Sequence, residues 1–192
     1  MHRFPPLLLL VLLPLAACDS DDVTQTASAS ISAPADTTTG VTGTVQFTQD
    51  GDELEMRVTV NGLAANSTHG FHIHETGSCA RGDHDDDGFA EVAGAAMGHY
   101  DPYGTMDHGA PDDDVDSKHA GDFGNLTANA SGTATATLTT DILSLDGTRP
   151  IEGRAVMVHS MRDDLESDPG GMSGDRIGCG VISMATDTSD DD

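Results

Sequence analysis

The 192-residue chain has no tryptophan, only two tyrosines and five phenylalanines, and few basic residues. Its eight lysines and arginines stand against 33 aspartates and glutamates, so the formal net charge is −25 at pH 7. Proteins that bind nucleic acid present a basic face to the phosphates, and this composition therefore argues against a nucleic-acid partner. The acidic surface indicates a highly soluble protein, or one that works at high salt, where repulsion between like charges is screened.

The chain also lacks an apolar run long enough to span a bilayer. The longest, residues 7–15, follows a short basic start at Arg3 and predicts a secretory signal. The run ends in Leu-Ala-Ala-Cys at residues 15–18, which resembles the lipobox of bacterial lipoproteins. In such proteins the leader is removed and the cysteine is acylated, so we expect residues 1–17 to be cleaved and Cys18 to anchor the protein in the bacterial cell envelope or periplasm. An ordinary signal peptide with a chance cysteine is the alternative.

Large apolar side chains are scarce in two further segments. Residues 18–40 are rich in Asp, Ser, Thr and Ala and predict a linker, with room for a first strand near its end. Residues 187–192 predict a solvated acidic tail. Between them, residues 41–186 are long enough for one domain with its own hydrophobic core.

Only three cysteines are present. If Cys18 carries lipid, then Cys79 and Cys179 remain. Two cysteines in an oxidising compartment suggest one disulfide, and two separate buried thiols are the alternative.

Helical periodicity is nearly absent, whereas alternation of polar and apolar residues is frequent. Residues 42–48 and 53–60 alternate on either side of a Gly-containing turn and predict a hairpin. Further strands are expected at residues 70–74, 126–130, 133–138, 155–158 and 177–184. Several short strands with turn signals predict an all-β fold, an antiparallel sandwich or barrel. Two long stretches without strand patterning, residues 79–121 and 160–176, are interpreted as functional loops.

Histidines supply the clearest chemical signal. His72 and His74 lie two apart in an expected strand, so both rings point to one face and can reach one metal ion, although two surface histidines would give the same pattern. Three more histidines and a carboxylate suit a closed tetrahedral zinc site: His99, His108, His119 and Asp122. Nitrogen and oxygen donors without thiolate fit Zn²⁺ or Cu²⁺.

Several motifs occur in a fixed order along the chain. They are GFHIHE at residues 70–75, GHYDP at 98–102, HAGDFGNL at 119–126, VH at 158–159 and SGDRIGCGVI at 173–182. Together they resemble the copper/zinc superoxide dismutases over nearly all of residues 40–186. The resemblance implies a Greek-key antiparallel β-sandwich or barrel of about eight strands with two long functional loops.

The resemblance also implies one copper and one zinc ion per subunit. It assigns the copper ligands as His72, His74, His99 and His159, and the zinc ligands as His99, His108, His119 and Asp122. His99 would then bridge the two ions. The implied activity is dismutation of superoxide to dioxygen and hydrogen peroxide by alternate reduction and oxidation of copper, with a structural zinc, as an antioxidant defence.

Other residues take supporting roles in the resemblance. Asp163 matches a carboxylate that links a copper-ligand histidine (His72) to a zinc-ligand histidine (His108) and so fixes both rings. Arg176 matches the arginine that draws the superoxide anion to copper, and with His99 it is the predicted catalytic group. His69 matches a framework histidine that is not a ligand. Cys79 and Cys179 match the family disulfide.

The chain departs from the family in three places. Residues 79–99 are longer than in the animal enzymes and resemble the bacterial periplasmic branch, in a region that often helps form a dimer, so a homodimer is possible. The segment 160–176 carries acids where relatives often carry guiding lysines. Residues 83–88 (DHDDDG) open like a calcium-binding loop, but Gly94 stands at the twelfth position in place of glutamate, so a solvated acidic loop is the preferred interpretation and calcium the weaker one.

Two other functions fit part of the sequence. An envelope copper or zinc carrier would bind the metals without fast turnover. A structural lipoprotein would use the metals only to stabilise its fold. Both are less favoured, because every matched ligand, Asp163 and Arg176 are present.

Overall fold

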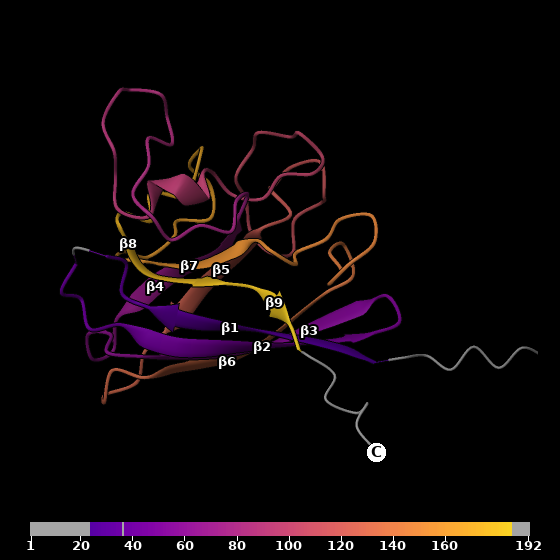
Figure 1. Cartoon of the computed structure of the whole chain (residues 1–192), viewed down its shortest axis with the longest axis horizontal. Helices are drawn as coiled ribbons and strands as arrows, with labels where there is room; N and C mark the ends of the chain where they lie inside the picture. The colour runs from indigo at the N-terminus through magenta and orange to yellow at the C-terminus, as the bar shows by residue number, and fades with distance from the viewer. Residues whose placement is uncertain (1–23, 36, 186–192) are drawn as a thin grey trace, which may run out of the picture.

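The computed structural model describes residues 24–35 and 37–185, which form nine strands and one short 3-10 helix (Figure 1). The predicted all-β fold is confirmed. The elements are β1 (Gln25–Ser32), β2 (Thr42–Asp50), β3 (Glu53–Asn61), β4 (Thr68–His74), η1 (Gly94–Ala96), β5 (Asp122–Thr127), β6 (Ala134–Thr140), β7 (Ala155–His159), β8 (Arg176–Val181) and β9 (Ser183–Met184).

The strands form one antiparallel sheet that nearly closes into a barrel. Its order is β5-β4-β7-β8-β1-β2-β3-β6, and β9 pairs with β1. The neighbours β3–β6 and β4–β7 are distant in sequence, so the connections cross between hairpins as in Greek-key folds. An isolated β-bridge between Ala128, which follows β5, and Ala134 of β6 joins the two edge strands of the sheet.

The hairpin β2–β3 shows how the sequence builds the barrel. Its nine residue pairs run from Thr42–Asn61 to Asp50–Glu53, as the alternation of the sequence predicts. Gly51, in the turn, has φ +57°, a conformation that glycine adopts without steric cost. Every second side chain of β3 is buried in the core, from Leu54 to Val60.

Strand β1 lies inside the segment predicted as a linker. The sequence predicts a first strand only near the end of residues 18–40, whereas β1 already begins at Gln25 and lies between β2 and β8. Ala27, Ala29 and Ile31 are buried, while the serines between them are exposed. The pattern is weak in sequence because alanine and serine differ little in hydrophobicity. The predicted leader, Cys18 and the acidic tail at 187–192 lie outside the described residues.

Two other strand boundaries differ from the predictions. Strand β5 begins four residues before the expected residue 126, because Asp122 already pairs with His72 of β4 across a bulge. The expected strand 177–184 is divided into β8 and β9 at the buried Ile182. No helix among the described residues combines the length and apolar character needed to cross a membrane.

The two long segments without strand patterning lie along one side of the barrel, above its strands in Figure 1. A disulfide joins Cys79 in the first of them to Cys179 in β8, with a Cα–Cα distance of 5.7 Å, which confirms the predicted pairing. Cys179 packs with Ala93 and Ala96 at the two ends of η1 and with Met157 of β7 in a small apolar cluster separate from the main core. The loop is therefore fastened to the barrel by both a covalent bond and apolar contacts.

Candidate metal centre

The first side-chain cluster forms where β4 and β7 meet. Along β4, Phe71 and Ile73 belong to the apolar core, and His72 and His74 alternate with them. His159 is the last residue of β7. His99 lies beside His74, because the backbones of the two residues form an isolated β-bridge. Nitrogen atoms of the four histidines lie within 4.8 Å of one another. The structure thus brings together all four residues that the sequence assigned to copper.

The second cluster shares His99 with the first. It comprises His99, His108, His119 and Asp122, whose ligand atoms also lie within 4.8 Å of one another. His99 Nδ1 lies 2.6 Å from Asp122 Oδ1, so its Nε2 is left for the first cluster. Asp122 is fixed in turn, because its Oδ2 accepts hydrogen bonds from the backbone N–H of His119 and of Gly109. These are the four residues that the sequence assigned to zinc.

Asp163 connects the two clusters. Its fully buried carboxylate accepts hydrogen bonds from His72 Nε2 (2.8 Å) and His108 Nε2 (2.9 Å). Its own backbone is held by Asn125, whose side-chain amide bonds both the N–H and the carbonyl of Asp163. Because Asp163 occupies Nε2 of each ring, it orients Nδ1 of both rings toward the clusters.

Three buried imidazole nitrogens indicate that the two clusters suit metal ions. His72 Nδ1, His108 Nδ1 and His119 Nδ1 are buried and have no hydrogen-bond partner. His108 Nδ1 and His119 Nδ1 lie 3.1 and 3.2 Å from oxygens of Asp122, in the second cluster. Buried polar atoms are normally satisfied, so unpaired imidazole nitrogens gathered in this way are what metal ions would satisfy. The nitrogen and carboxylate donor sets fit a copper and a zinc site.

Burial and charge set the protonation of these groups. Burial lowers the pKa of His72 and His74 well below the usual value and that of His159 to about 3, so these rings are neutral at pH 7, as metal ligands must be. Burial also opposes a charge on His108, but the carboxylates of Asp122 and Asp163 outweigh it and raise the His108 pKa to about 10. A metal ion at this cluster therefore has to displace a proton from His108.

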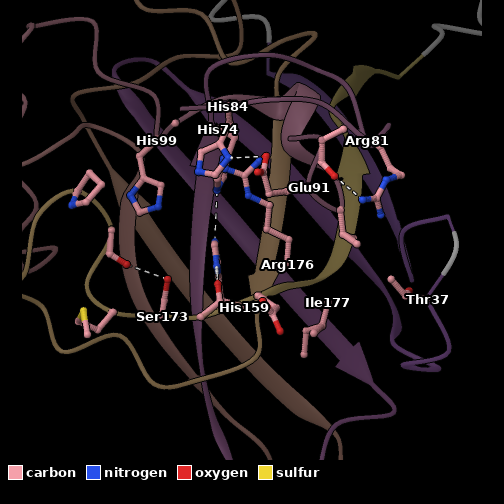
Figure 2. Close-up of a pocket in the computed structure, with 18 of the residues that line it drawn as sticks. Thr37, His74, Arg81, His84, Glu91, His99, His159, Ser173, Arg176 and Ile177 are labelled. Atoms are coloured by element: carbon pink, nitrogen blue, oxygen red, sulfur yellow. Dashed lines mark hydrogen bonds and ion pairs between the residues drawn. The ribbon is translucent and has the colours of Figure 1, made fainter. Parts of the chain in front are cut away.

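Arg176 stands at the mouth of the first cluster. A pocket of about 740 Å³ is lined by Arg176 and by His74, His99 and His159 (Figure 2). The guanidinium donates to the carbonyls of Ala93 and Met97, both at 2.7 Å, at the two ends of η1. The Met97 carbonyl also accepts a hydrogen bond from His74 Nδ1 at 2.8 Å. One loop thus positions both a histidine of the first cluster and the arginine above it.

Arg176 keeps its charge in this position. Burial lowers its pKa to about 10, and the nearby carboxylate of Glu91 acts in the opposite direction. The guanidinium is therefore protonated at pH 7. Sequence patterns did not reveal the partners of Arg176, because Ala93 and Met97 contribute only backbone carbonyls.

Other predicted residues lie outside the two clusters. His69 Nδ1 lies 2.7 Å from the carbonyl of His159, and His69 Nε2 lies 2.6 Å from Ser67 Oγ. In the loop at residues 83–88, the Asp83 carboxylate accepts the backbone N–H groups of Asp87 and Gly88. Calcium binding at this loop stays a prediction.

Gly171 is a site residue that the sequence did not single out. Its φ is +64°, and a Cβ there would lie 1.9 Å from Asp163 Oδ1 and 2.6 Å from His108 Nε2. We expect Gly171→Ala to displace the Asp163 carboxylate and to weaken zinc binding by about 10–100-fold, the usual effect of losing a carboxylate that supports a metal ligand. Zinc affinity measured by competition with a chelator checks this expectation.

Gly153→Ala is the matched control for backbone strain. Gly153 also has a positive φ, +75°, but a Cβ there meets no atom within 4 Å. Equal losses of zinc affinity in the two variants would show that Gly171 matters only for its backbone conformation.

Comparison with known proteins agrees with this geometry. The sequence model of the family described as copper/zinc superoxide dismutase (SODC) matches residues 41–182. The chain is similar to a superoxide dismutase [Cu-Zn] of Paramecium bursaria Chlorella virus 1, with 37% identity over 76% of this chain and 74% of that protein. It is also similar to the extracellular superoxide dismutases [Cu-Zn] of Drosophila melanogaster (41% identity; 76% of this chain, 77% of that protein) and Caenorhabditis elegans (39%; 75% and 62%). The chain therefore belongs to the copper/zinc superoxide dismutase family, a family of oxidoreductases.

Proposed function

We propose that the protein converts superoxide and protons to dioxygen and hydrogen peroxide. Copper would be held by the first cluster, His72, His74, His99 and His159, and zinc by the second, His99, His108, His119 and Asp122. The observation that carries this proposal is the set of three buried nitrogens without hydrogen-bond partners, His72 Nδ1, His108 Nδ1 and His119 Nδ1. Copper supplies alternate one-electron oxidation and reduction, whereas zinc has no redox chemistry.

His99 is the proposed proton carrier. Its Nδ1 is held against Asp122, and its Nε2 faces the first cluster and the pocket. Burial lowers the pKa of His99 below that of a free imidazole and the Asp122 carboxylate opposes this shift, and Nε2 is the proposed holder of one of the two protons that hydrogen peroxide needs. Asp163 has a positioning role, since it fixes the His72 and His108 rings.

Arg176 is the proposed anion guide, and its charge gives a prediction. Arg176→Glu is expected to lower kcat/KM by about 10-fold or more at low ionic strength, because it replaces attraction for superoxide by repulsion at the mouth of the site. The rate constant can be measured by pulse radiolysis or stopped flow. Arg57→Glu changes the net charge equally at an exposed position paired with Glu55, away from the pocket, and should have little effect. Equal effects of the two substitutions would contradict a local role for Arg176.

We further propose that the protein is exported and that Cys18 is acylated after removal of residues 1–17. The lipobox-like residues 15–18, the disulfide and the two relatives named extracellular support export. Mass spectrometry of the mature N-terminus in a bacterial host tests the anchor, and Cys18→Ser should abolish acylation. A homodimer stays a prediction.

The decisive experiment uses residues 19–192, which retain every described residue. The protein is loaded with copper and zinc, and superoxide loss is measured beside metal-free protein. Fast dismutation that depends on both metals supports the proposal. Tight binding of both metals without turnover would favour a metal carrier.

A further inference from the structure

We propose that Arg81 is a second anion-guiding residue, which receives superoxide in the outer part of the pocket before it reaches Arg176. This inference rests on the proposed function. Arg81 and Arg176 are the only lysine or arginine residues in the described part of the chain that line the pocket. In the view of Figure 2, Arg176 lies between Arg81 and the histidines of the first cluster.

The backbone around Arg81 is held in place. Gly82 and Glu91 exchange two backbone hydrogen bonds, of 2.8 and 3.2 Å, and Ala95 N–H donates to the carbonyl of Ala80 at 3.2 Å. The Arg81 side chain also bonds to the chain opposite, because its Nη2 donates to the carbonyl of Ala90, the residue before Glu91. The guanidinium is therefore fixed to the loop.

The disulfide ties the two arginines to each other. Cys79 precedes Arg81 by two residues, and Cys179 follows Arg176 by three. Arg176 is bound to the carbonyls of Ala93 and Met97, in the same loop whose Ala90 carbonyl binds Arg81. Both positive charges of the pocket are thus bonded to the same loop.

The charge of Arg81 is available to an incoming anion. Its one hydrogen bond is to a neutral carbonyl, and no carboxylate pairs with it among the described residues, whereas Arg57 and Arg154 each pair with a glutamate. A guanidinium carries five N–H donors, so several remain unused, and Arg81 is exposed. Its field therefore reaches the solvent of the pocket.

Acidic side chains also line the pocket, and their negative charge opposes the entry of an anion. Glu91, Asp168 and Asp175 line it, and Glu91 lies close enough to affect the pKa of Arg176. A pocket of about 740 Å³ is far larger than a diatomic anion, so superoxide has to cross a space bordered by both signs of charge. A fixed outer cation would offset the acids along that path.

The test compares Arg81→Gln with Arg57→Gln in the copper- and zinc-loaded protein. Both substitutions remove one positive charge, but only Arg81 lines the pocket. At about 10 mM ionic strength we expect Arg81→Gln to lower kcat/KM about two- to fivefold and Arg57→Gln to leave it nearly unchanged. At about 1 M salt, where the Debye length is about 3 Å, the difference should disappear. Arg81→Lys, which keeps the charge, should retain most of the rate.

Other results would overturn the inference. An Arg81→Gln rate equal to that of the parent protein at low salt would remove the guiding role. A loss that persists at high salt, or that comes with altered copper and zinc content, would show that Arg81 only supports the loop. Azide titration of the copper-loaded protein gives a readout without turnover: Arg81→Gln should weaken azide binding at low salt only. A parent protein with no dismutation but with this azide effect would contradict the proposed function and keep the anion site.

Discussion

Replacing His159 by alanine is expected to lower dismutation by more than about a hundredfold and to leave zinc binding largely intact. His159 belongs to the first cluster alone, where its Nε2 lies 3.3 Å from His74 Nε2. Its Nδ1 donates to the carbonyl of Gly174 at 3.1 Å, which fixes the ring. Losing even a group that only supports a metal ligand costs about 10–100-fold, so loss of a ligand itself should cost more.

Metal content and activity have to be measured together. Copper and zinc per chain are determined after loading and dialysis, and superoxide loss is followed on the same samples. His84→Ala is the control for an exposed histidine outside both clusters, and it also measures any metal taken up by the separate group of His84, Asp85 and Glu91. If His159→Ala keeps both copper and turnover, the assignment of the first cluster to copper is wrong.

The metal-free protein is expected to be most stable near pH 6.5 and to lose stability in both directions. Burial lowers the pKa of His72 and His74, and that of His159 to about 3, while the unfolded chain takes up these protons near pH 6.5. Between pH 6.5 and 3 the unfolded state therefore binds more protons, so the free energy of unfolding falls as the pH is lowered.

His108 acts in the opposite direction. Its pKa is raised to about 10, so between pH 6.5 and 10 the folded state holds a proton that the unfolded state has lost. The free energy of unfolding therefore falls as the pH rises through this range. Zinc takes the place of that proton, so the alkaline loss should be smaller in the zinc-loaded protein.

Urea unfolding at a series of pH values, with a chelator present, measures this dependence. His159→Ala should flatten the acid side of the curve, and His108→Ala the alkaline side. A free energy of unfolding that rises steadily from pH 4 to pH 9 would contradict the proposed balance between the buried neutral histidines and the charged His108.

Local patterns predicted most of the strands, with some boundaries shifted, but not the start of β1. The hairpin β2–β3 was predicted because valine, leucine and phenylalanine alternate with polar residues around Gly51. The sequence predicts a linker over residues 18–40 with room for a strand only near its end, because Ala27 and Ala29 carry little hydrophobic signal, although both are buried. The pairing of β1 with β2 and β8 comes from contacts distant in sequence, which override weak propensity.

The sequence by itself determined the residues available for chemistry: histidines at strand spacing, a histidine-rich loop with Asp122, and two cysteines beyond the leader. Only the tertiary structure decided which nitrogen of each ring faces a cluster, which atoms of Asp163 bond His72 and His108, and that Arg81 shares a pocket with Arg176. The reason is physical. His108, Asp163 and Arg81 lie on long loops without periodicity, and the position of the loop that holds Arg81 is set by a disulfide and by backbone carbonyls that any residue can supply.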